Sequence, residues 1–149
     1  MKQEAGRVSH FRFLRQGTEA MKEYSKRVLI IDDQSSLRGL VRDILENYDE
    51  NLYIEEEENG LNAIVNLECR DYDLLICDVK MPEMDGFEVI QTIRNWTWNP
   101  KVPVIMLTAE ADPASIARGA TLGATSYLTK PFNEADLLNA VRSLIGRAS

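Results

Sequence analysis

Three short, nearly continuous apolar runs constrain the fold of this chain more than any other feature. The runs span Val28–Ile31, Leu74–Cys77 and Val104–Leu107, and a polar residue follows each of them. An uninterrupted apolar run of this length is typical of a strand that is buried on both faces of a parallel sheet. The sequence predicts two further strands, at Leu52–Ile54 and Ser126–Thr129. Four glutamates follow the first of these and indicate a solvated strand end at a sheet edge.

Apolar residues at helical spacing lie between these strands. Residues 37–45 carry the stripe of a helix that packs against a sheet, and Ser35 or Ser36 is its expected N-cap. Four further helical patterns lie at residues 63–67, 87–93, 116–120 and 137–145. Because strand and helix alternate five times, the sequence predicts an α/β fold: a doubly wound parallel sheet with helices on both faces.

Composition and charge disfavour several classes of protein. The 149 residues, of which 44% are hydrophobic and 28% charged, favour one globular domain with a tail over a two-domain enzyme. The net charge of −7 disfavours nucleic acid as a direct ligand, because phosphate contacts need clustered basic side chains. Cys69 and Cys77 lack metal-ligand spacing, and no apolar run approaches the ~18 residues of a membrane span or resembles a secretory signal. We therefore expect a soluble, cytoplasmic protein.

The first 25 residues differ from the rest of the chain. Basic residues outnumber acidic ones there, and the aromatic residues follow no clear period. We expect residues 1–25 to be a flexible extension, or to reflect a start codon assigned upstream of Met21, and residues 26–149 to form the domain. A basic, aromatic arm is also compatible with contact to a partner or a membrane surface, and we assign it no function.

Polar residues at the ends of the predicted strands form the candidate site. Ligands of a doubly wound sheet bind outside the carboxyl ends of its strands. Asp32 and Asp33 end the first strand, Asp78 the third and Thr108 the fourth, and Lys130 closely follows the fifth. A single aspartate at such a position is more often a helix N-cap. Two carboxylates about 4 Å apart, however, repel by roughly 4 kcal/mol at an effective dielectric constant near 20, so a proton or a divalent cation has to neutralise them.

The cation that such a cluster would bind is Mg²⁺, because Mg²⁺ prefers oxygen ligands and keeps some of its waters. Beside Mg²⁺, a carboxylate can attack a phosphoryl group while Lys130 and the Thr108 hydroxyl bind its oxygens. The product would be an aspartyl phosphate, whose added charge Mg²⁺ and Lys130 offset. The five polar residues therefore predict a site that accepts a phosphoryl group.

Four strings of the sequence closely resemble the receiver domain of bacterial two-component response regulators. They are VLIIDD, LLICDVKMPEMDG, VIMLTA and YLTKPF, which begin at residues 28, 74, 104 and 127. Each string alone is a weak signal, but the four occur in the family's order and spacing from about residue 26 onward. The resemblance implies a flavodoxin-like fold with strand order 2-1-3-4-5. It also implies a single-domain, chemotaxis-regulator-like signalling switch, which assists its own phosphorylation and dephosphorylation but is not an enzyme.

The resemblance also implies roles for the acidic residues. Asp78 matches the phospho-acceptor of the family. Asp33 and Asp78 would contact Mg²⁺ directly and Asp32 through water, and the backbone carbonyl of Lys80 would complete the protein ligands. No organic cofactor is implied.

Three further residues match the part of the family that binds and senses the phosphoryl group. Thr108 matches the switch hydroxyl, Tyr127 the switch aromatic and Lys130 the phosphate-binding lysine, and the Lys130–Pro131 bond is cis in the family. The resemblance implies a two-state mechanism, in which the phosphoryl oxygens draw Thr108 inward, Tyr127 turns into the vacated space and a surface for partners is remodelled.

The implied partners are a phosphoryl donor and a protein target. A histidine kinase or a histidine phosphotransfer protein would phosphorylate Asp78. Because the chain ends at Ser149, soon after the fifth predicted helix, we expect the output to pass through another protein; homodimerisation on phosphorylation is left open. The main rival is a pseudo-receiver, an unphosphorylated interaction module, although such modules typically lack an acid, the hydroxyl or the lysine. A phosphatase of the haloacid dehalogenase type would need an aspartate where this chain has Lys80.

Overall fold

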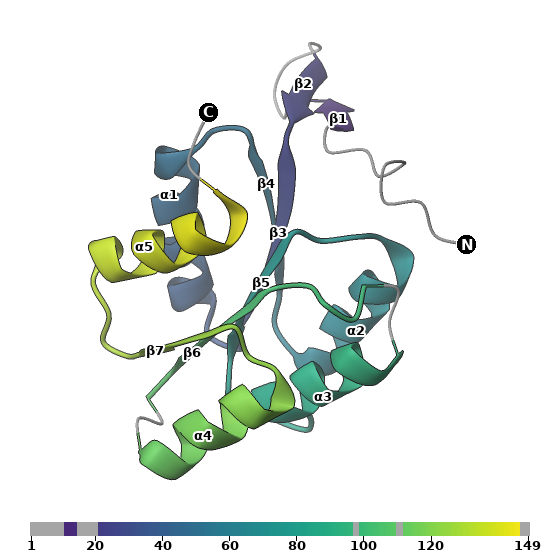
Figure 1. Ribbon diagram of the computed structural model, residues 1–149. Helices are drawn as coiled ribbons and strands as arrows, with labels where there is room; N and C mark the ends of the chain where they lie inside the picture. Colours follow the sequence, from purple (N-terminus) through teal and green to yellow (C-terminus); the bar gives the residue numbers. More distant parts are fainter. Residues whose placement is uncertain (1–10, 15–20, 97–98, 110–111, 147–149) are drawn as a thin grey trace.

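The computed structural model describes residues 11–14, 21–96, 99–109 and 112–146 (Figure 1). Within these ranges the chain forms seven strands and five helices. In chain order they are β1 (Phe11–Leu14), β2 (Met21–Tyr24), β3 (Lys26–Ile31), α1 (Ser35–Tyr48), β4 (Leu52–Glu57), α2 (Gly60–Cys69), β5 (Leu74–Asp78), α3 (Gly86–Trp96), β6 (Val104–Thr108), α4 (Pro113–Leu122), β7 (Ser126–Thr129) and α5 (Glu134–Ile145).

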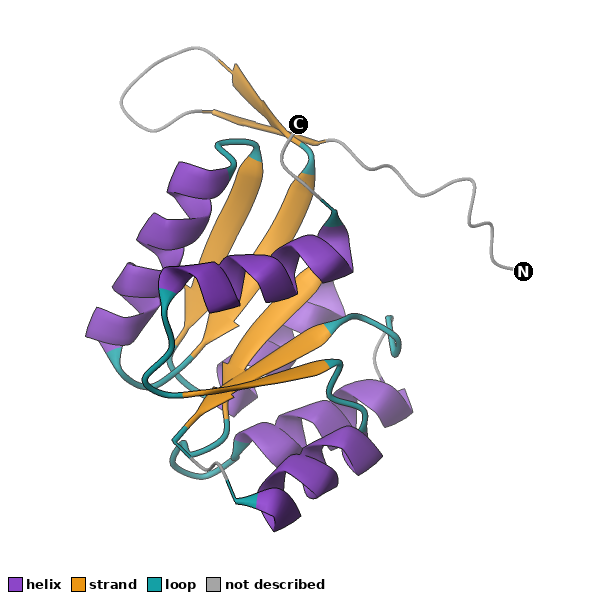
Figure 2. Ribbon diagram, turned by 60° about the vertical axis from the view of Figure 1, so that its left-hand side comes forward, coloured by secondary structure: helices purple, strands orange, loops and turns teal. Residues whose placement is uncertain are grey.

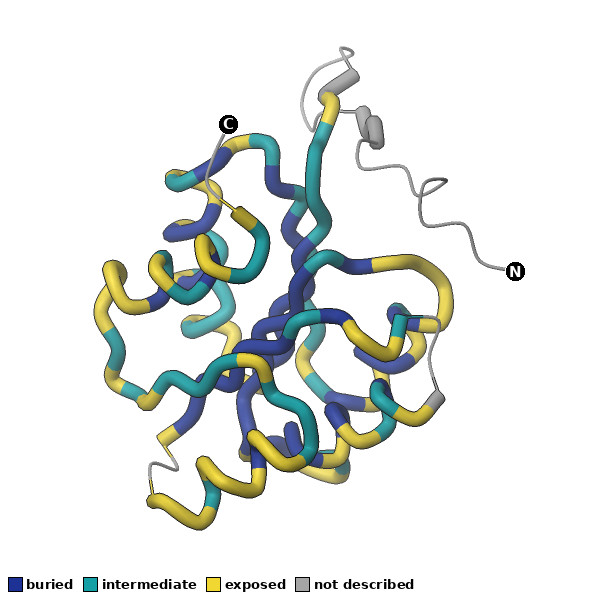
Figure 3. The backbone as a smooth tube through the Cα atoms, in the orientation of Figure 1, coloured by how far each residue is buried: buried dark blue, intermediate teal, exposed yellow. Residues whose placement is uncertain are grey.

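The centre of the molecule is a five-stranded parallel sheet in the order β4-β3-β5-β6-β7. Counted from β3, this is the predicted order 2-1-3-4-5, which is confirmed. Every residue of β5 and β6 is buried, and β3 is buried from Val28 to its end. Figure 3 shows these buried inner strands running through the middle of the molecule. Their continuous apolar sequences therefore reflect burial on both faces, as predicted.

Helices cover both faces of the sheet (Figure 2). On one face α1 and α5 enclose a core cluster that includes Leu45 and Val141, and on the other α2 and α3 enclose a cluster that includes Leu67 and Ile93. The fourth helix, α4, contacts α3 and β7 and buries little besides Gly119, which is why its apolar pattern is weak in the sequence. The predicted layers are thus confirmed.

The edge strand β4 is longer than the sequence predicted, and the predicted role of its glutamates was wrong. The strand continues through Glu57 instead of ending at Ile54, and its glutamates do not form a merely solvated strand end. Glu55 forms an ion pair with Arg27 at 3.1 Å, and Glu56 forms one with Arg38 at 2.9 Å. Paired carboxylates are compatible with strand backbone at a sheet edge, and their arginine partners are distant in sequence.

The predicted N-cap of α1 was also wrong. Neither Ser35 nor Ser36 caps the helix, because both lie inside its first turn. The N-cap is Gln34, whose side chain makes no capping hydrogen bond. Instead, the backbone N–H of Gln34 donates to Asp32 Oδ1 at 2.9 Å. The loop between β3 and α1 is therefore organised by an aspartate of the candidate site.

Strands β1 and β2 form a separate antiparallel pair that the sequence did not predict. Phe11 pairs with Tyr24 and Leu14 with Met21, and Figure 1 places this pair at the amino end of β3. The division of the chain into residues 1–25 and 26–149 stays a prediction. Among the described residues, both cysteines are free thiols, and every helix is too short or too polar to cross a bilayer.

Candidate metal and phosphoryl site

The five polar residues lie where their strands end. Asp32 and Asp33 directly follow β3, Asp78 is the last residue of β5, Thr108 is the last residue of β6, and Lys130 directly follows β7. Since these strands are parallel neighbours, their carboxyl ends lie at one edge of the sheet. The fold therefore brings the predicted residues to a common edge from four separate strands.

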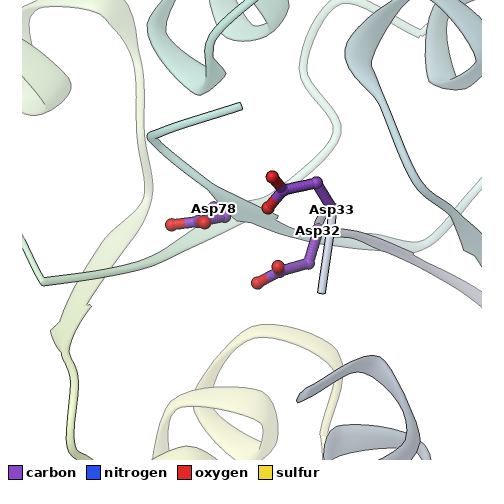
Figure 4. A group of neighbouring side chains, drawn as sticks. All are labelled: Asp32, Asp33 and Asp78. Atoms are coloured by element: carbon purple, nitrogen blue, oxygen red, sulfur yellow. The ribbon is translucent and has the colours of Figure 1, made fainter. Parts of the chain in front are cut away.

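The carboxylates of Asp32, Asp33 and Asp78 form one cluster (Figure 4). One oxygen from each carboxylate lies within 4.8 Å of the others. Asp32 and Asp78 are buried, at 3% and 6% exposure, whereas Asp33 is exposed. A buried carboxylate pair is costly without a compensating cation, and hard oxygen ligands with one solvent-exposed member suit a partly hydrated Mg²⁺ ion. The donor atoms at this cluster thus fit the predicted metal.

Lys130 supplies positive charge to the same cluster. Its Nζ atom lies 3.4 Å from Asp32 Oδ2 and 3.4 Å from Asp78 Oδ2. The other oxygen of each carboxylate accepts from the backbone: Asp32 Oδ1 from Gln34, and Asp78 Oδ1 from Val79 at 2.8 Å. Every carboxylate oxygen of the buried pair therefore has a protein partner within the site.

The electrostatic environment perturbs Asp78. Burial raises the pKa of its carboxyl, and the neighbouring Asp32 charge raises this pKa further, while the Lys130 ammonium and the Val79 N–H act in the opposite direction. The net pKa lies above the ordinary value for aspartate. Added positive charge, such as a divalent cation, would favour the ionised carboxylate, so charge on Asp78 and cation binding are coupled.

The predicted switch residues lie beside this cluster and along β7. Thr108 is buried at 1% exposure, and Tyr127 is half-buried against the core on the α3 side of the sheet. A Cβ atom built on Gly119 in α4 would lie 3.2 Å from two carbons of the Tyr127 ring. Gly119 therefore leaves space for this ring, which the sequence analysis missed, although a glycine inside a helical pattern is a recognised signal of close packing.

The loop after Asp78 approaches the end of β5 closely. The Gly86 N–H donates to the Val79 carbonyl at 2.7 Å, and a Cβ atom at Gly86 would clash with the Asp78 carbonyl oxygen. Lys80 is exposed in this loop, and the role of its carbonyl as a metal ligand stays a prediction. The Lys130–Pro131 bond is cis, as the resemblance implied.

The family model of the response regulator receiver domain matches residues 28–142. The chain belongs to the receiver domain family. Receiver domains act in phosphorylation-dependent signalling of two-component systems and are not classical enzymes, so the chain is a signalling domain of this kind.

Curated relatives agree with this assignment. The chain is 38% identical over 123 residues to the transcriptional regulatory protein ResD of Bacillus subtilis, covering 83% of this chain and 49% of ResD. It is 33% identical over 123 residues to the regulatory protein VanRc of Enterococcus gallinarum, covering 83% and 51%. It is also 33% identical over 129 residues to the chemotaxis protein CheY-3 of Vibrio cholerae, covering 87% and 98%. The chain thus spans about half the length of the first two relatives and nearly all of the third.

Solved structures agree as well. The chemotaxis response regulator CheY4 of Vibrio cholerae has a TM-score of 0.73 at 33% identity, covering 80% of this chain and 98% of that one. A putative response regulator from Chloroflexus aurantiacus has a TM-score of 0.75 at 28% identity, covering 82% and 98%. These similarities confirm the flavodoxin-like fold and a chemotaxis-regulator-like receiver domain.

Proposed function

We propose that this receiver domain is a switch in which Asp78 accepts a phosphoryl group from a histidine kinase or a histidine phosphotransfer protein. The observation that carries the proposal is the geometry of the site. Three carboxylates have oxygens within 4.8 Å of one another, and one ammonium lies 3.4 Å from both buried members. Such an arrangement suits the binding of a cation and a phosphoryl group at the same place.

The residues of the site would divide the chemistry between them. In the proposed step, a carboxylate oxygen of Asp78 attacks the phosphorus of a phosphohistidine, the P–N bond breaks, and its electron pair stays on the histidine nitrogen. Asp33, Asp78 and the Lys80 carbonyl would hold Mg²⁺ directly, with Asp32 holding it through water. When bound, Mg²⁺ supplies positive charge to the carboxylates and the phosphoryl oxygens. Lys130, already 3.4 Å from Asp78 Oδ2, would bind the transferred phosphoryl oxygens.

The proposed signal passes from the phosphoryl group to Thr108 and Tyr127. Thr108 is buried at the end of β6, next in the sheet to β5, which ends at Asp78. This position supports a role in which its hydroxyl would follow the phosphoryl oxygens. Tyr127 lies on the neighbouring strand β7 and packs against Gly119 of α4. A movement of Thr108 and the tyrosine ring would change the surface formed around α4 and β7. We propose that this surface signals to a separate protein.

Labelling with acetyl phosphate and Mg²⁺ tests the proposal. Peptide mapping of the wild-type protein should find one phosphoryl group on the peptide that contains Asp78, and none when Mg²⁺ is chelated. Asp78→Asn should abolish this label. Asp43→Asn is the matched control, because Asp43 is an exposed aspartate of α1, and this variant should be labelled like the wild type.

Two results would contradict the proposal. Undiminished labelling of the Asp78→Asn variant would place the acceptor elsewhere. Absence of any label on a folded wild-type protein, with acetyl phosphate and with a panel of histidine kinases, would favour the pseudo-receiver function.

A further inference from the structure

Arg38 lies between the acidic cluster and the edge strand β4. It is in the first turn of α1, and its side chain is 15% exposed. Its Nη1 donates to the backbone carbonyl of Asp32 at 2.6 Å, and its Nε donates to Glu56 Oε1 at 2.9 Å. One guanidinium therefore connects the backbone of a site residue to a carboxylate of the neighbouring strand.

The carboxylate that anchors Arg38 is itself fixed. Arg42, one turn further along α1, donates from Nε to Glu56 Oε2 at 2.6 Å and from Nη2 to the carbonyl of Ile54 at 3.1 Å. Burial alone would raise the pKa of Glu56, but the hydrogen bonds from Arg42 and Arg38 hold this pKa below its ordinary value. Glu56 thus stays ionised at neutral pH and offers Arg38 a charged acceptor in a fixed position.

The carbonyl that Arg38 contacts belongs to the peptide plane between Asp32 and Asp33. The Asp32 N–H donates to the Glu57 carbonyl at 3.1 Å. Strand β4 therefore binds the N–H of Asp32 directly, and it binds the Asp32 carbonyl through Arg38. Because a peptide group is planar, the direction of the Asp32 carbonyl also sets the direction of the bond that leads to Asp33. A rotation of this plane would move the Asp33 carboxylate relative to those of Asp32 and Asp78.

We infer that Arg38 is a positioning residue that holds the Asp32–Asp33 peptide in the orientation in which the three carboxylates share one divalent cation. This inference rests on the proposed function. The role requires a guanidinium, because two acceptors in different directions are bridged by a rigid fork of N–H donors, which a lysine ammonium does not reproduce. Partners that orient metal ligands typically change metal affinity by about 10- to 100-fold when they are removed.

A comparison of two arginine variants tests the inference. Arg38→Gln should weaken Mg²⁺ binding by about tenfold or more, measured by calorimetry. Arg42→Gln is the matched control, because Arg42 shares the contact with Glu56 but its own hydrogen bonds go to Glu56, Glu46 and the Ile54 carbonyl. It acts on Asp32 only through Glu56, so this variant should weaken Mg²⁺ binding clearly less than Arg38→Gln does. Arg38→Lys, which keeps the charge, should remain weaker than the wild type.

Two further measurements separate positioning from stability. Urea unfolding without Mg²⁺ should give similar free energies for Arg38→Gln and Arg42→Gln, because each loses an ion pair with Glu56 and a contact with one backbone carbonyl. The additional ion pair between Arg42 and Glu46 is exposed and contributes little. The amide ¹H–¹⁵N resonance of Asp33 should shift in Arg38→Gln before any Mg²⁺ is added, and should shift less in Arg42→Gln, which keeps the hydrogen bond from Arg38 to the Asp32 carbonyl.

Either of two outcomes overturns the inference. Equal Mg²⁺ affinities in the two arginine variants, or an unmoved Asp33 resonance in Arg38→Gln, would mean that Arg38 contributes only to stability. A wild-type protein that binds no Mg²⁺ would instead remove the metal site of the proposed function, and the inference with it. The Mg²⁺ titration of the wild type therefore distinguishes failure of the positioning role of Arg38 from failure of the proposed metal site.

Discussion

Replacement of Lys130 by methionine removes an ammonium that contacts both buried carboxylates of the site, while an apolar side chain of similar length remains. The Nζ atom lies 3.4 Å from Asp32 Oδ2 and from Asp78 Oδ2. At an effective dielectric constant of about 20, each of these attractions has a gross value of about 5 kcal/mol. The carboxylates left behind have side chains only 4% and 8% exposed. Uptake of a proton by one of them limits the cost, so we expect Lys130→Met to lower the free energy of unfolding by about 2 to 3 kcal/mol at neutral pH.

The pH dependence of this loss follows from the pKa of Asp78. That pKa is already raised by burial and by Asp32, and removal of the ammonium should raise it further. The folded protein then binds more protons than the unfolded chain between the ordinary aspartate pKa of about 4 and the raised value, so stability decreases as pH rises through this window. The loss in free energy of unfolding caused by Lys130→Met should therefore be largest near neutral pH and become smaller in mild acid.

Urea unfolding in the presence of a chelator, with a double-mutant cycle, measures the effect. In the Asp78→Asn background, Lys130→Met should lower the free energy of unfolding by about 1 to 2 kcal/mol less than it does in the wild type. The reason is that only one carboxylate then loses its partner. Equal costs in both backgrounds would refute the coupling between Lys130 and Asp78. A loss below about 0.5 kcal/mol in the wild type would show that solvent screens the ion pair.

Three other predictions concern the metal site and the Tyr127 contact. Asp33→Asn should leave the free energy of unfolding within about 0.5 kcal/mol, because Asp33 is exposed, yet weaken Mg²⁺ binding by calorimetry; unchanged affinity would remove Asp33 from the site. Mg²⁺ at about 100 times its dissociation constant should stabilise the wild type by about 2.7 kcal/mol in urea unfolding, and no stabilisation would contradict binding to the folded state. Gly119→Ala should give little net change in stability, because a helix-propensity gain of about 1 kcal/mol is offset by crowding against the Tyr127 ring. The Tyr127 ring resonances should shift, and a full gain in stability with unmoved resonances would place the ring elsewhere.

The sheet and the candidate site were predictable because each leaves a local signal. A strand buried on both faces has to be apolar at every position, so Val104–Leu107 reads as a central strand without knowledge of its neighbours. Parallel topology then places strand ends at one edge of the sheet, which brings Asp32 and Asp78 together. These two steps need only the order of residues along the chain.

The contacts that support the site were not predictable, because they join residues with no local signal. Arg38 looks like any polar residue of an amphipathic helix until α1 packs beside β4 and meets Glu56. Ser35 is a good N-cap by residue type, but the hydrogen bond from Gln34 to Asp32 starts the helix differently. The pairing of Phe11 with the strand before β3 follows no period in the sequence.

A crystal structure of the protein with Mg²⁺ and beryllofluoride, a mimic of the phosphoryl group, would show whether Asp78 is the acceptor and whether the three aspartates hold the metal. We expect beryllofluoride on a carboxylate oxygen of Asp78, with Lys130 and Thr108 in contact with its fluorine atoms. We also expect Mg²⁺ to be bound directly by Asp33 and Asp78, and by Asp32 through water. Beryllofluoride on another residue, or Mg²⁺ density away from the three aspartates, would contradict the proposed site.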